Sequence, residues 1–417
     1  MEFTKSSGDR KPVTIAVVGA GLRGRQYARL AERNGGRIVA VAEPEQGRRA
    51  AFAKAHDIPA RGVFESWEEL TTKVADAAII ATQDRLHAEP AVRLAGMGYH
   101  LLLEKPMAPT EPEARRIADA VEAAGVIGAV CHVLRYTSYT KALKRAIAEI
   151  GDLVSVQHLE PVGWWHQAHS FVRGNWRRED ESGPMLLTKS CHDLDWLAYV
   201  IGDTPRSVAS FGGLAHFHAG NKPERAGTRC TDCAVEPQCP YSAVRLYQLD
   251  EYKWPLDAVI DELDPHKLES ALSNGPYGRC VYDCDNDVVD HQVVAMQYTG
   301  GVTATFTMTA FTPMQRRQTR LFGTHGSIEG DGRLLHVTDF RTGTTSTSTT
   351  STTGTTGTGD VGEGHDGGDE GLVTAFLAAV AADDPGLLSS DMATSLASHR
   401  VVWSAERARL TSTVVRI

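Results

Sequence analysis

The chain of 417 residues is longer than one hydrophobic core usually organises, so its length favours two domains. Its hydrophobic share of 42% and charged share of 23% are those of an ordinary globular protein and exclude collagen-like and fully disordered chains. The formal net charge of -9 repels polyanions and argues against nucleic-acid binding. A polar tail over 1–12 without an apolar signal segment, and no apolar stretch long enough to span a membrane, predict a cytoplasmic protein without membrane contact.

A dinucleotide-binding pattern follows the tail. The β-branched run at 13–18 predicts a buried strand that leads directly into the glycine turn GAGLRG at 19–24, and helical spacing of apolar residues follows. In this motif the first glycine permits a tight turn, the second lets the backbone approach a pyrophosphate, and the third lets the helix lie close to the sheet. We expect the turn to contact the cofactor through Gly19, Gly21, Leu22, Arg23 and Gly24.

A carboxylate ends the next predicted strand. Glu43 follows the apolar run at 37–42 and lies about twenty residues beyond the glycine turn, where a carboxylate can accept hydrogen bonds from the adenosine ribose. It would repel the 2′-phosphate of NADP, so NAD is the predicted cofactor. Arg48 and Arg49 follow and leave NADP open as the alternative.

Strands and helices continue to alternate, with strands at 75–81 and 99–103 around a helix at 89–97. This order predicts a doubly wound parallel sheet in a domain over 13–137, with the ligand beyond the carboxyl ends of the strands. Polar clusters lie at two such ends, and we expect them to line the cofactor site. Their members are Thr82, Gln83, His87, Glu104 and Lys105.

Three motifs together carry a family resemblance. GAGLRG at 19–24, ATQDRLH at 81–87 and LLLEKPMAPT at 101–110 resemble the Gfo/Idh/MocA (glucose-fructose oxidoreductase / inositol dehydrogenase) family. The resemblance implies a nicotinamide-binding Rossmann domain and a bond between Lys105 and Pro106 that can be cis. It also implies that Lys105 lies near the nicotinamide and the reacting sugar hydroxyl, although a lysine after a strand is by itself more often a solvated loop residue.

The pattern changes after residue 137. Alternating apolar and polar residues predict strands at 153–159, 208–217, 288–298, 302–311 and 319–322, which indicates an α+β domain with an open, largely antiparallel sheet over 138–417. The resemblance includes this domain, which we expect to bind substrate. We also expect it to form a homo-oligomer, a dimer or tetramer, through the open sheet.

The predicted substrate chemistry centres on the segment LLTKSCHDLD at 186–195. A single histidine at a helix start is more often structural, but the resemblance implies that His192 faces the substrate. Many family members carry an aspartate four residues earlier, where this chain has Thr188, so His192 is the predicted general base, alone or with Lys105. Thr188 would hydrogen-bond the sugar, and Lys189 adds a cation beside the site.

Aromatic residues and side-chain donors gather at 164–176. Aromatic faces and fixed polar groups suit a carbohydrate, whereas a core loop whose tryptophans merely pack is the alternative. The predicted substrate-binding residues are Trp165, His166, Arg173, Asn175, Trp176, Lys189 and His192.

Five of the seven cysteines cluster in a predicted insertion over about 222–285. Cys230, Cys233 and Cys239, with either Cys280 or Cys284, would supply the four ligands of a structural zinc ion that pins an insertion lacking its own core. An iron–sulfur cluster or free thiols are the alternatives.

A tract of Thr, Ser and Gly at 342–359 predicts a mobile loop, because it has no apolar area to bury. A helix at 372–382 follows, for which Asp369 is the expected N-terminal cap.

Together these patterns predict an NAD-dependent oxidoreductase that acts on a secondary hydroxyl of a sugar, cyclitol or sugar derivative. Two alternatives stay open: a glycosidase that acts by transient oxidation and elimination with a tightly held NAD, and a non-catalytic sugar or nucleotide sensor.

Overall fold

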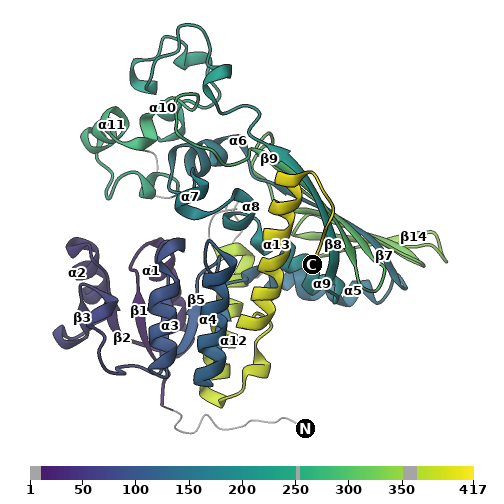
Figure 1. The fold of residues 1–417 in the computed structure, drawn as a ribbon, viewed down its shortest axis with the longest axis horizontal. Helices are drawn as coiled ribbons and strands as arrows, with labels where there is room; N and C mark the ends of the chain where they lie inside the picture. Colours follow the sequence, from purple (N-terminus) through teal and green to yellow (C-terminus); the bar gives the residue numbers. More distant parts are fainter. Residues whose placement is uncertain (1–10, 250–253, 351–363) are drawn as a thin grey trace. The chain divides into compact units, whose positions relative to one another are not determined.

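The computed structural model of the protein describes residues 11–249, 254–350 and 364–417. The chain divides into two compact units, which are drawn in Figure 1. The first combines the chain up to Thr137 with Gly364–His399, and the second combines Ser138–Glu363 with Arg400–Ile417.

The described part of the first unit holds a six-stranded parallel sheet in the order β3-β2-β1-β4-β5-β6. Its strands are β1 (Thr14–Val18), β2 (Arg37–Ala42), β3 (Val63–Phe64), β4 (Ala77–Ile80), β5 (His100–Leu103) and β6 (Gly128–Val130). Its connecting helices are α1 (Leu22–Arg33), α2 (Gln46–Ala55), α3 (Ala88–Gly96) and α4 (Glu111–Ala124). The strand order reverses between β1 and β4, which is where such sheets bind their ligands, and the predicted Rossmann fold is confirmed.

Helix α12 (Gly368–Ala382) also belongs to the first unit, although the sequence analysis assigned it to the second domain. Its Leu372 and Phe376 are buried in one apolar cluster with Ile15 of β1 and Tyr27 of α1. The apolar face of α12 therefore completes the core around α1, a long-range pairing that local sequence patterns do not encode.

The second unit is built on a nine-stranded sheet in the order β14-β13-β12-β11-β7-β10-β9-β8-β15, as far as the residues are described. Its strands are β7 (Leu153–Pro161), β8 (Pro205–Gly213), β9 (His291–Tyr298), β10 (Thr303–Thr309), β11 (Gln318–Gly323), β12 (Gly326–Gly330), β13 (Leu334–Asp339), β14 (Thr344–Thr349) and β15 (Val415–Arg416). Only β7 and β10 pair in parallel within these ranges, so the predicted largely antiparallel sheet is confirmed.

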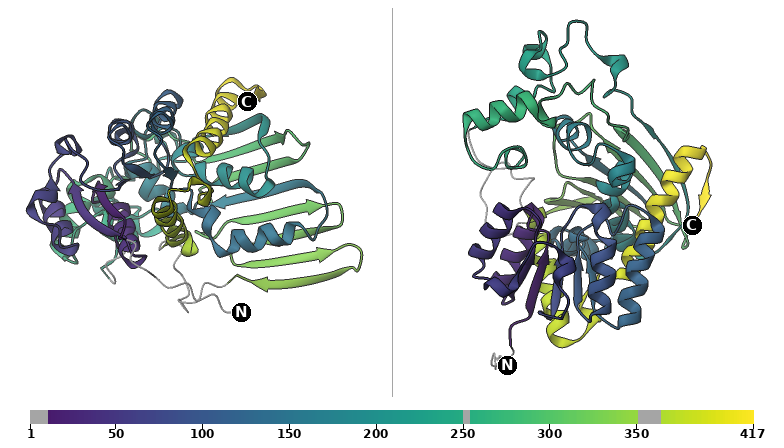
Figure 2. Two further views of the ribbon diagram at one scale, coloured as in Figure 1. Left: turned by 90° about the horizontal axis from the view of Figure 1, so that it is seen from below. Right: turned by 60° about the vertical axis from the view of Figure 1, so that its left-hand side comes forward.

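Helices cover one face of this sheet, and Figure 2 shows its strands side by side. The covering helices are α5 (Ser138–Ile147), α9 (Cys191–Ile201) and the second half of α13 (Met392–Thr411). His158 of β7 stacks on Trp196 of α9 with ring centroids 4.7 Å apart, and Gln292 of β9 donates to Glu406 of α13 at 2.6 Å. None of the described helices has the length and apolar character to cross a membrane.

Two expectations for the second unit are wrong. The insertion has an apolar core of its own, in which Leu256, Leu268 and Leu272 are buried beside Tyr247. Part of the threonine tract forms β14, which pairs with β13 over Leu334–Asp339, because threonine suits a half-exposed strand and the backbone finds partners there. Residues 351–359 of the tract lie outside the described residues.

Candidate active site

The glycine turn between β1 and α1 has the geometry that a dinucleotide site requires. Gly19 has a φ of +92°, and a Cβ added there would lie 2.6 Å from the carbonyl oxygen of Ala81. A Cβ on Gly24 would overlap the carbonyl oxygen of Gly19, whereas one on Gly21 would meet nothing within 4 Å. Two of the glycines are therefore needed for close packing, and the third faces open space.

The start of α1 fits a pyrophosphate. Gly21 is the N-cap residue, no side chain caps the helix, and its first turn holds no acidic residue. The first N–H groups of a helix lack partners within the helix and favour an anion. Leu22, also at this start, has 39% of its surface exposed.

Glu43 lies beside this turn at the end of β2. Its side chain is buried, and Oε2 accepts a hydrogen bond from the Ala20 N–H at 2.8 Å. Arg48 lies beside Glu45 at 3.6 Å, and Arg49 donates to the Glu43 carbonyl at 2.6 Å. Both arginines that kept NADP open as a cofactor therefore have partners within the protein.

The loops after β4 and β5 are joined by His87. This buried imidazole contacts the carbonyl of Pro106 at 2.9 Å through Nδ1 and that of Thr82 at 3.2 Å through Nε2. Thr82 Oγ1 is buried without a hydrogen-bond partner among the described residues, and Gln83 is exposed. The two predicted polar clusters thus form one connected edge, with an unsatisfied hydroxyl that a ligand could engage.

Arg23, predicted to contact the cofactor, is held by two buried carboxylates. Its guanidinium pairs with Glu104 at 2.5 Å and with Asp369 of α12 at 2.6 Å. Although burial raises the pKa of the Glu104 carboxyl, the charges of Arg23 and Lys105 lower it below its usual range. The expectation that Asp369 caps α12 is wrong. The N-cap residue is Gly367, no side chain caps this helix, and the Asp369 carboxylate pairs with Arg23 instead.

The backbone around Lys105 is fixed on both sides. Its N–H donates to Glu104 Oε2 at 2.6 Å, and the peptide bond to Pro106 is cis. The Met107 N–H donates to Nε2 of His399 at 3.1 Å. His399 was missed by the sequence analysis, since nothing local to α13 relates it to a loop 292 positions away.

The second unit carries the other predicted catalytic residues. His192 lies in the first turn of α9 and is 4% exposed, and Thr188 ends α8 (Met185–Thr188) at 3% exposed. Lys189 between them pairs with Glu160 at 3.1 Å. Burial lowers the pKa of Lys189 while Glu160 opposes that shift, so the predicted extra cation has a carboxylate partner.

A buried charge network anchors the start of α9, and the sequence analysis missed it. Asp193 accepts from His158 at 3.1 Å and pairs with Arg317, which also reaches Glu160 at 3.1 Å. Burial alone would raise the pKa of Asp193, but Arg317 and His158 hold it well below its usual range. The network fixes the residue next to His192.

The aromatic segment forms helix α6 (Trp164–His166) and a π-helical turn over Gln167–Arg173. The rings of Trp165 and His166 lie 5.0 and 4.9 Å from that of Trp254, a residue of the insertion that the sequence analysis did not single out. Asn175 and Trp176 are exposed. Trp165 and His166 thus belong to an aromatic cluster, to which Trp176 is linked through Phe171, whose ring lies 6.2 Å from that of Trp176 and 5.8 Å from that of His166.

Arg173, the remaining predicted substrate residue of this segment, is only 1% exposed. It donates to the carbonyls of Arg279 and Tyr241, each at 2.8 Å, and to the sulfur of Cys230 at 3.5 Å. These contacts place its guanidinium against the cysteine cluster.

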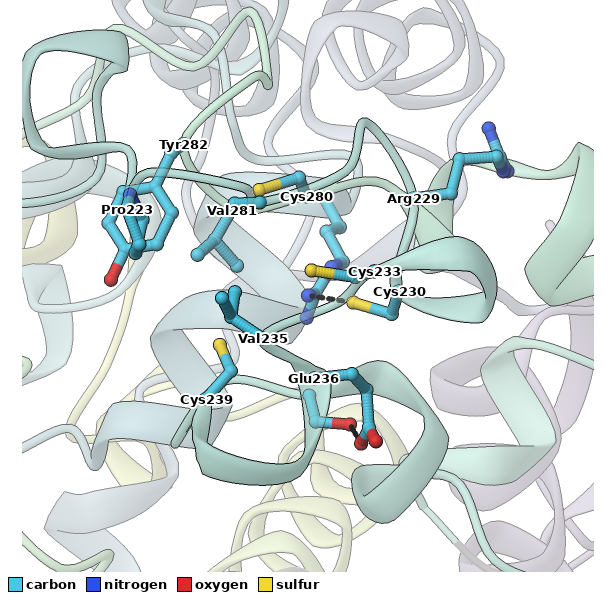
Figure 3. Close-up of a pocket in the computed structure, with 13 residues that line it drawn as sticks. Pro223, Arg229, Cys230, Cys233, Val235, Glu236, Cys239, Cys280, Val281 and Tyr282 are labelled. Carbon is cyan, nitrogen blue, oxygen red and sulfur yellow. Dashed lines mark hydrogen bonds between the residues drawn. The ribbon is translucent and has the colours of Figure 1, made fainter.

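Four of the five clustered cysteines line one cavity (Figure 3). They are Cys230, Cys233, Cys239 and Cys280, whereas Cys284 is not part of the lining. All are free thiols, and burial raises the pKa of Cys239 and Cys280. No three His, Cys, Asp or Glu side chains of the described residues are arranged to hold a metal ion, so the predicted zinc site is not preformed.

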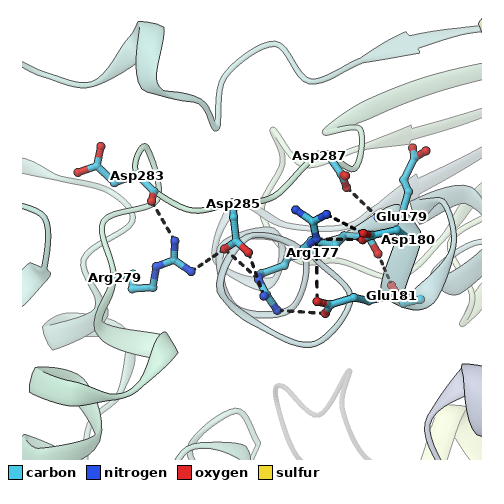
Figure 4. Close-up of polar contacts among 10 residues, drawn as sticks. Arg177, Glu179, Asp180, Glu181, Arg279, Asp283, Asp285 and Asp287 are labelled. Atoms are coloured by element: carbon cyan, nitrogen blue, oxygen red, sulfur yellow. Dashed lines mark hydrogen bonds and ion pairs between the residues drawn. The ribbon is translucent and has the colours of Figure 1, made fainter.

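Ion pairs at the surface hold the turn that follows Cys280 (Figure 4). Asp285 accepts from Arg177 at 3.0 Å and from Arg279 at 2.6 Å. Hydrogen bonds from Arg177 lower the pKa of Asp285, burial opposes that shift, and a hydrogen bond from Arg279 adds to the lowering. The turn is therefore tied to the segment that begins after Trp176.

Comparison with known proteins identifies the family. Residues 13–132 match the description "Oxidoreductase family, NAD-binding Rossmann fold", and residues 144–383 match "Oxidoreductase family, C-terminal alpha/beta domain". The chain belongs to the Gfo/Idh/MocA family. This confirms the resemblance that the three sequence motifs carry.

The names of the relatives that match this chain describe different activities. The chain is 26% identical over 268 residues to the putative oxidoreductase YteT of Bacillus subtilis, a match over 61% of this chain and 60% of the relative. It is 27% identical over 212 residues to 2,7-anhydro-N-acetylneuraminate hydratase of Escherichia coli, a match over 50% and 55% of the two chains. The matches thus span less than two thirds of each relative's length.

A levoglucosan dehydrogenase solved in complex with NADH and levoglucosan has the same fold. The TM-score is 0.71 at 16% identity, over 97% of this chain and 99% of the other.

Proposed function

We propose that the protein is an NAD-dependent oxidoreductase that moves hydride between nicotinamide and a secondary hydroxyl of a sugar, cyclitol or sugar derivative. The observation that carries this proposal, in a chain of this family, is the geometry at the start of α1. No side chain caps this helix, and a Cβ on Gly21 would meet nothing within 4 Å. The Glu43 carboxylate lies beside the same turn. We propose NAD over NADP because Glu43 would repel a 2′-phosphate.

The cofactor contacts would come from the first unit. The glycine turn would hold the pyrophosphate, and Thr82 offers a buried hydroxyl without a partner among the described residues. Gln83 lies exposed in the same loop. His87 and Glu104 would act by fixing the loops, since their side chains are engaged with protein groups. NAD, when bound, supplies the hydride acceptor.

Oxidation of an alcohol also needs a group that takes the hydroxyl proton. We assign that role to His192, because imidazole titrates near neutral pH and is a common general base. An ammonium group donates rather than accepts, so Lys105 would hydrogen-bond the developing alkoxide. Thr188 would position the hydroxyl, and Lys189, paired with Glu160, would act mainly by fixing its neighbours.

The aromatic cluster is the proposed sugar-binding surface. Trp165 and His166 gather against Trp254, and Trp176 and Asn175 are exposed nearby in the chain. Aromatic faces suit the C–H surface of a sugar, and polar groups beside them set its orientation.

A second candidate function is redox-neutral bond cleavage. One relative is named a 2,7-anhydro-N-acetylneuraminate hydratase, and an aspartate that many family members place at position 188 is a threonine here. A transient oxidation followed by elimination and re-reduction would leave the cofactor unchanged at the end of each turnover.

We also propose that the open face of the second sheet joins copies of the chain into a dimer or tetramer. Phe211 and Val293 face each other across β8 and β9, and Phe322 lies on β11, all with 37% or more of their surface exposed. Light scattering of the purified chain would test this, and a monomer at micromolar concentration would contradict it.

The function is tested by mixing the protein and NAD with a panel of sugars, cyclitols and anhydro-sugars. Net oxidation would accumulate NADH, whereas redox-neutral cleavage would show product without NADH. Deuterium placed on the reacting carbon would appear on the nicotinamide in the first case. Substrate turnover that is independent of bound nicotinamide would overturn the proposal.

A further inference from the structure

The cavity in the insertion brings together four sulfurs from three separate stretches of chain. Cys230 and Cys233 flank a short helical turn, Cys239 follows six residues later, and Cys280 lies about forty residues further on. Figure 3 shows their side chains around one space, with Val235 among them. Cys284 instead donates its thiol to the Cys280 carbonyl at 3.3 Å.

Each of the four sulfurs has a hydrogen-bond donor directed at it. Cys233 accepts from the Gly227 N–H at 3.3 Å. The sulfurs of Cys239 and Cys280 each accept a backbone hydrogen bond from the residue two positions on, Tyr241 and Tyr282. Donors of this kind stabilise thiolates, and they are the usual outer shell of a metal–sulfur site.

The fourth sulfur, that of Cys230, accepts from Arg173 at 3.5 Å. Arg173 is 1% exposed and makes no ion pair with a carboxylate in the part of the chain that is described, and its Nη1 has no hydrogen-bond partner there. A buried guanidinium without a counter-charge is costly. The Cys230 thiol, which can become an anionic thiolate, lies 3.5 Å from the Nη2 atom of this guanidinium.

We propose that this cavity binds one zinc ion through four thiolates. The ligands are Cys230, Cys233, Cys239 and Cys280. Four soft sulfurs suit tetrahedral zinc, and the resulting site carries a charge of about -2 that Arg173 partly offsets. Four S–H protons leave to solvent as four Zn–S bonds form, with no change of oxidation state.

Zinc binding would draw the four thiols together around the ion, because among the described residues they are not arranged to hold a metal. Closing the site would link two apolar clusters. Cys230 packs in the core of the insertion with Leu268 and Leu272, and Cys280 packs with Phe217 and Tyr241 in the neighbouring cluster. The ion therefore has a structural role and takes no part in the proposed hydride transfer.

The test is the metal content of the full chain purified without added metal. We expect about one zinc per chain, lost in Cys230→Ser and Cys239→Ser and retained in Cys284→Ser, which removes a neighbouring sulfur that is not a ligand. Arg173→Met should retain the ligands but release zinc to a chelator at least tenfold faster.

A second measurement covers variants that fail to fold. Wild-type chain stripped with a chelator and titrated with Co²⁺ should develop the intense thiolate charge-transfer absorption of a tetrahedral site, with one equivalent at saturation. Iron in place of zinc, disulfides among the four cysteines in fresh protein, or a titration without that absorption would each overturn the proposal.

Discussion

Replacing Arg23 by methionine should destabilise the protein far more than an ordinary surface substitution. Arg23 pairs with Glu104 and Asp369, whose side chains are 7% and 1% exposed. Removing one partner of a buried ion pair leaves an uncompensated charge and typically costs 3–5 kcal/mol. Because Glu104 keeps the hydrogen bond from the Lys105 N–H, we expect the lower part of that range, about 3 kcal/mol.

Arg33→Met is the matched control. Arg33 also lies in α1 and also pairs with an acid of α12, Glu370, but at 3.5 Å with the two side chains 68% and 46% exposed. Exposed ion pairs contribute roughly 0–1 kcal/mol to stability, so Arg33→Met should change the free energy of unfolding little. Urea unfolding monitored by a probe in the first unit gives both values. An equal loss of unfolding free energy in the two variants would refute the assignment of Arg23, Glu104 and Asp369 as a buried charge network.

The pH dependence supplies a further check with a definite sign. The pKa of Glu104 is lowered in the folded protein, so its contribution to stability is present above the unfolded value near 4.3 and is lost as pH falls through the folded value. The difference in stability between wild type and Arg23→Met should therefore shrink below about pH 4.

Three other predictions concern activity, cofactor choice and acid stability. Lys105→Ala and His192→Ala should each lower kcat by about a hundredfold or more, with Thr188→Ala costing less, and equal kcat values for wild type and His192→Ala would reject the base assignment. Glu43→Gln should reduce the preference for NADH over NADPH by about tenfold in a binding titration, because the charge that repels the 2′-phosphate is gone. Burial lowers the pKa of His169 to about 3, so stability should fall by up to about 2 kcal/mol from pH 7 to pH 5 as the unfolded imidazole takes up a proton, and urea titrations of His169→Gln should lack that fall.

Local patterns in the sequence were sufficient for the cofactor half of the fold. The buried strand β1, the glycine turn and strand β2 follow from apolar runs and backbone geometry within thirty residues, and β2 spans Arg37–Ala42 as predicted. The alternation of apolar and polar residues along β9 and β10 likewise predicts strands with one buried and one open face. Such features depend on neighbours in sequence.

The contacts that the sequence did not reveal join distant positions. Arg23 and Asp369 are 346 residues apart, and nothing near either one indicates the other. Trp254 reaches Trp165 only because the insertion folds back on α6. The fourth cysteine of the cavity is Cys280 rather than Cys284, a choice that depends on which way a turn directs its side chains.

The most direct test of the account is NADH binding to the Gly21→Asp variant. Gly21 has an extended backbone, and a Cβ there meets nothing within 4 Å, so the variant should fold, with aspartate serving as an N-cap of α1. Its carboxylate would occupy the place of the pyrophosphate and repel the negative charge of that group. We predict one saturable NADH site per chain in the wild type and at least a hundredfold weaker binding in Gly21→Asp, at unchanged thermal stability. NADH binding of equal affinity in both, or none in the wild type, would contradict the proposed cofactor site.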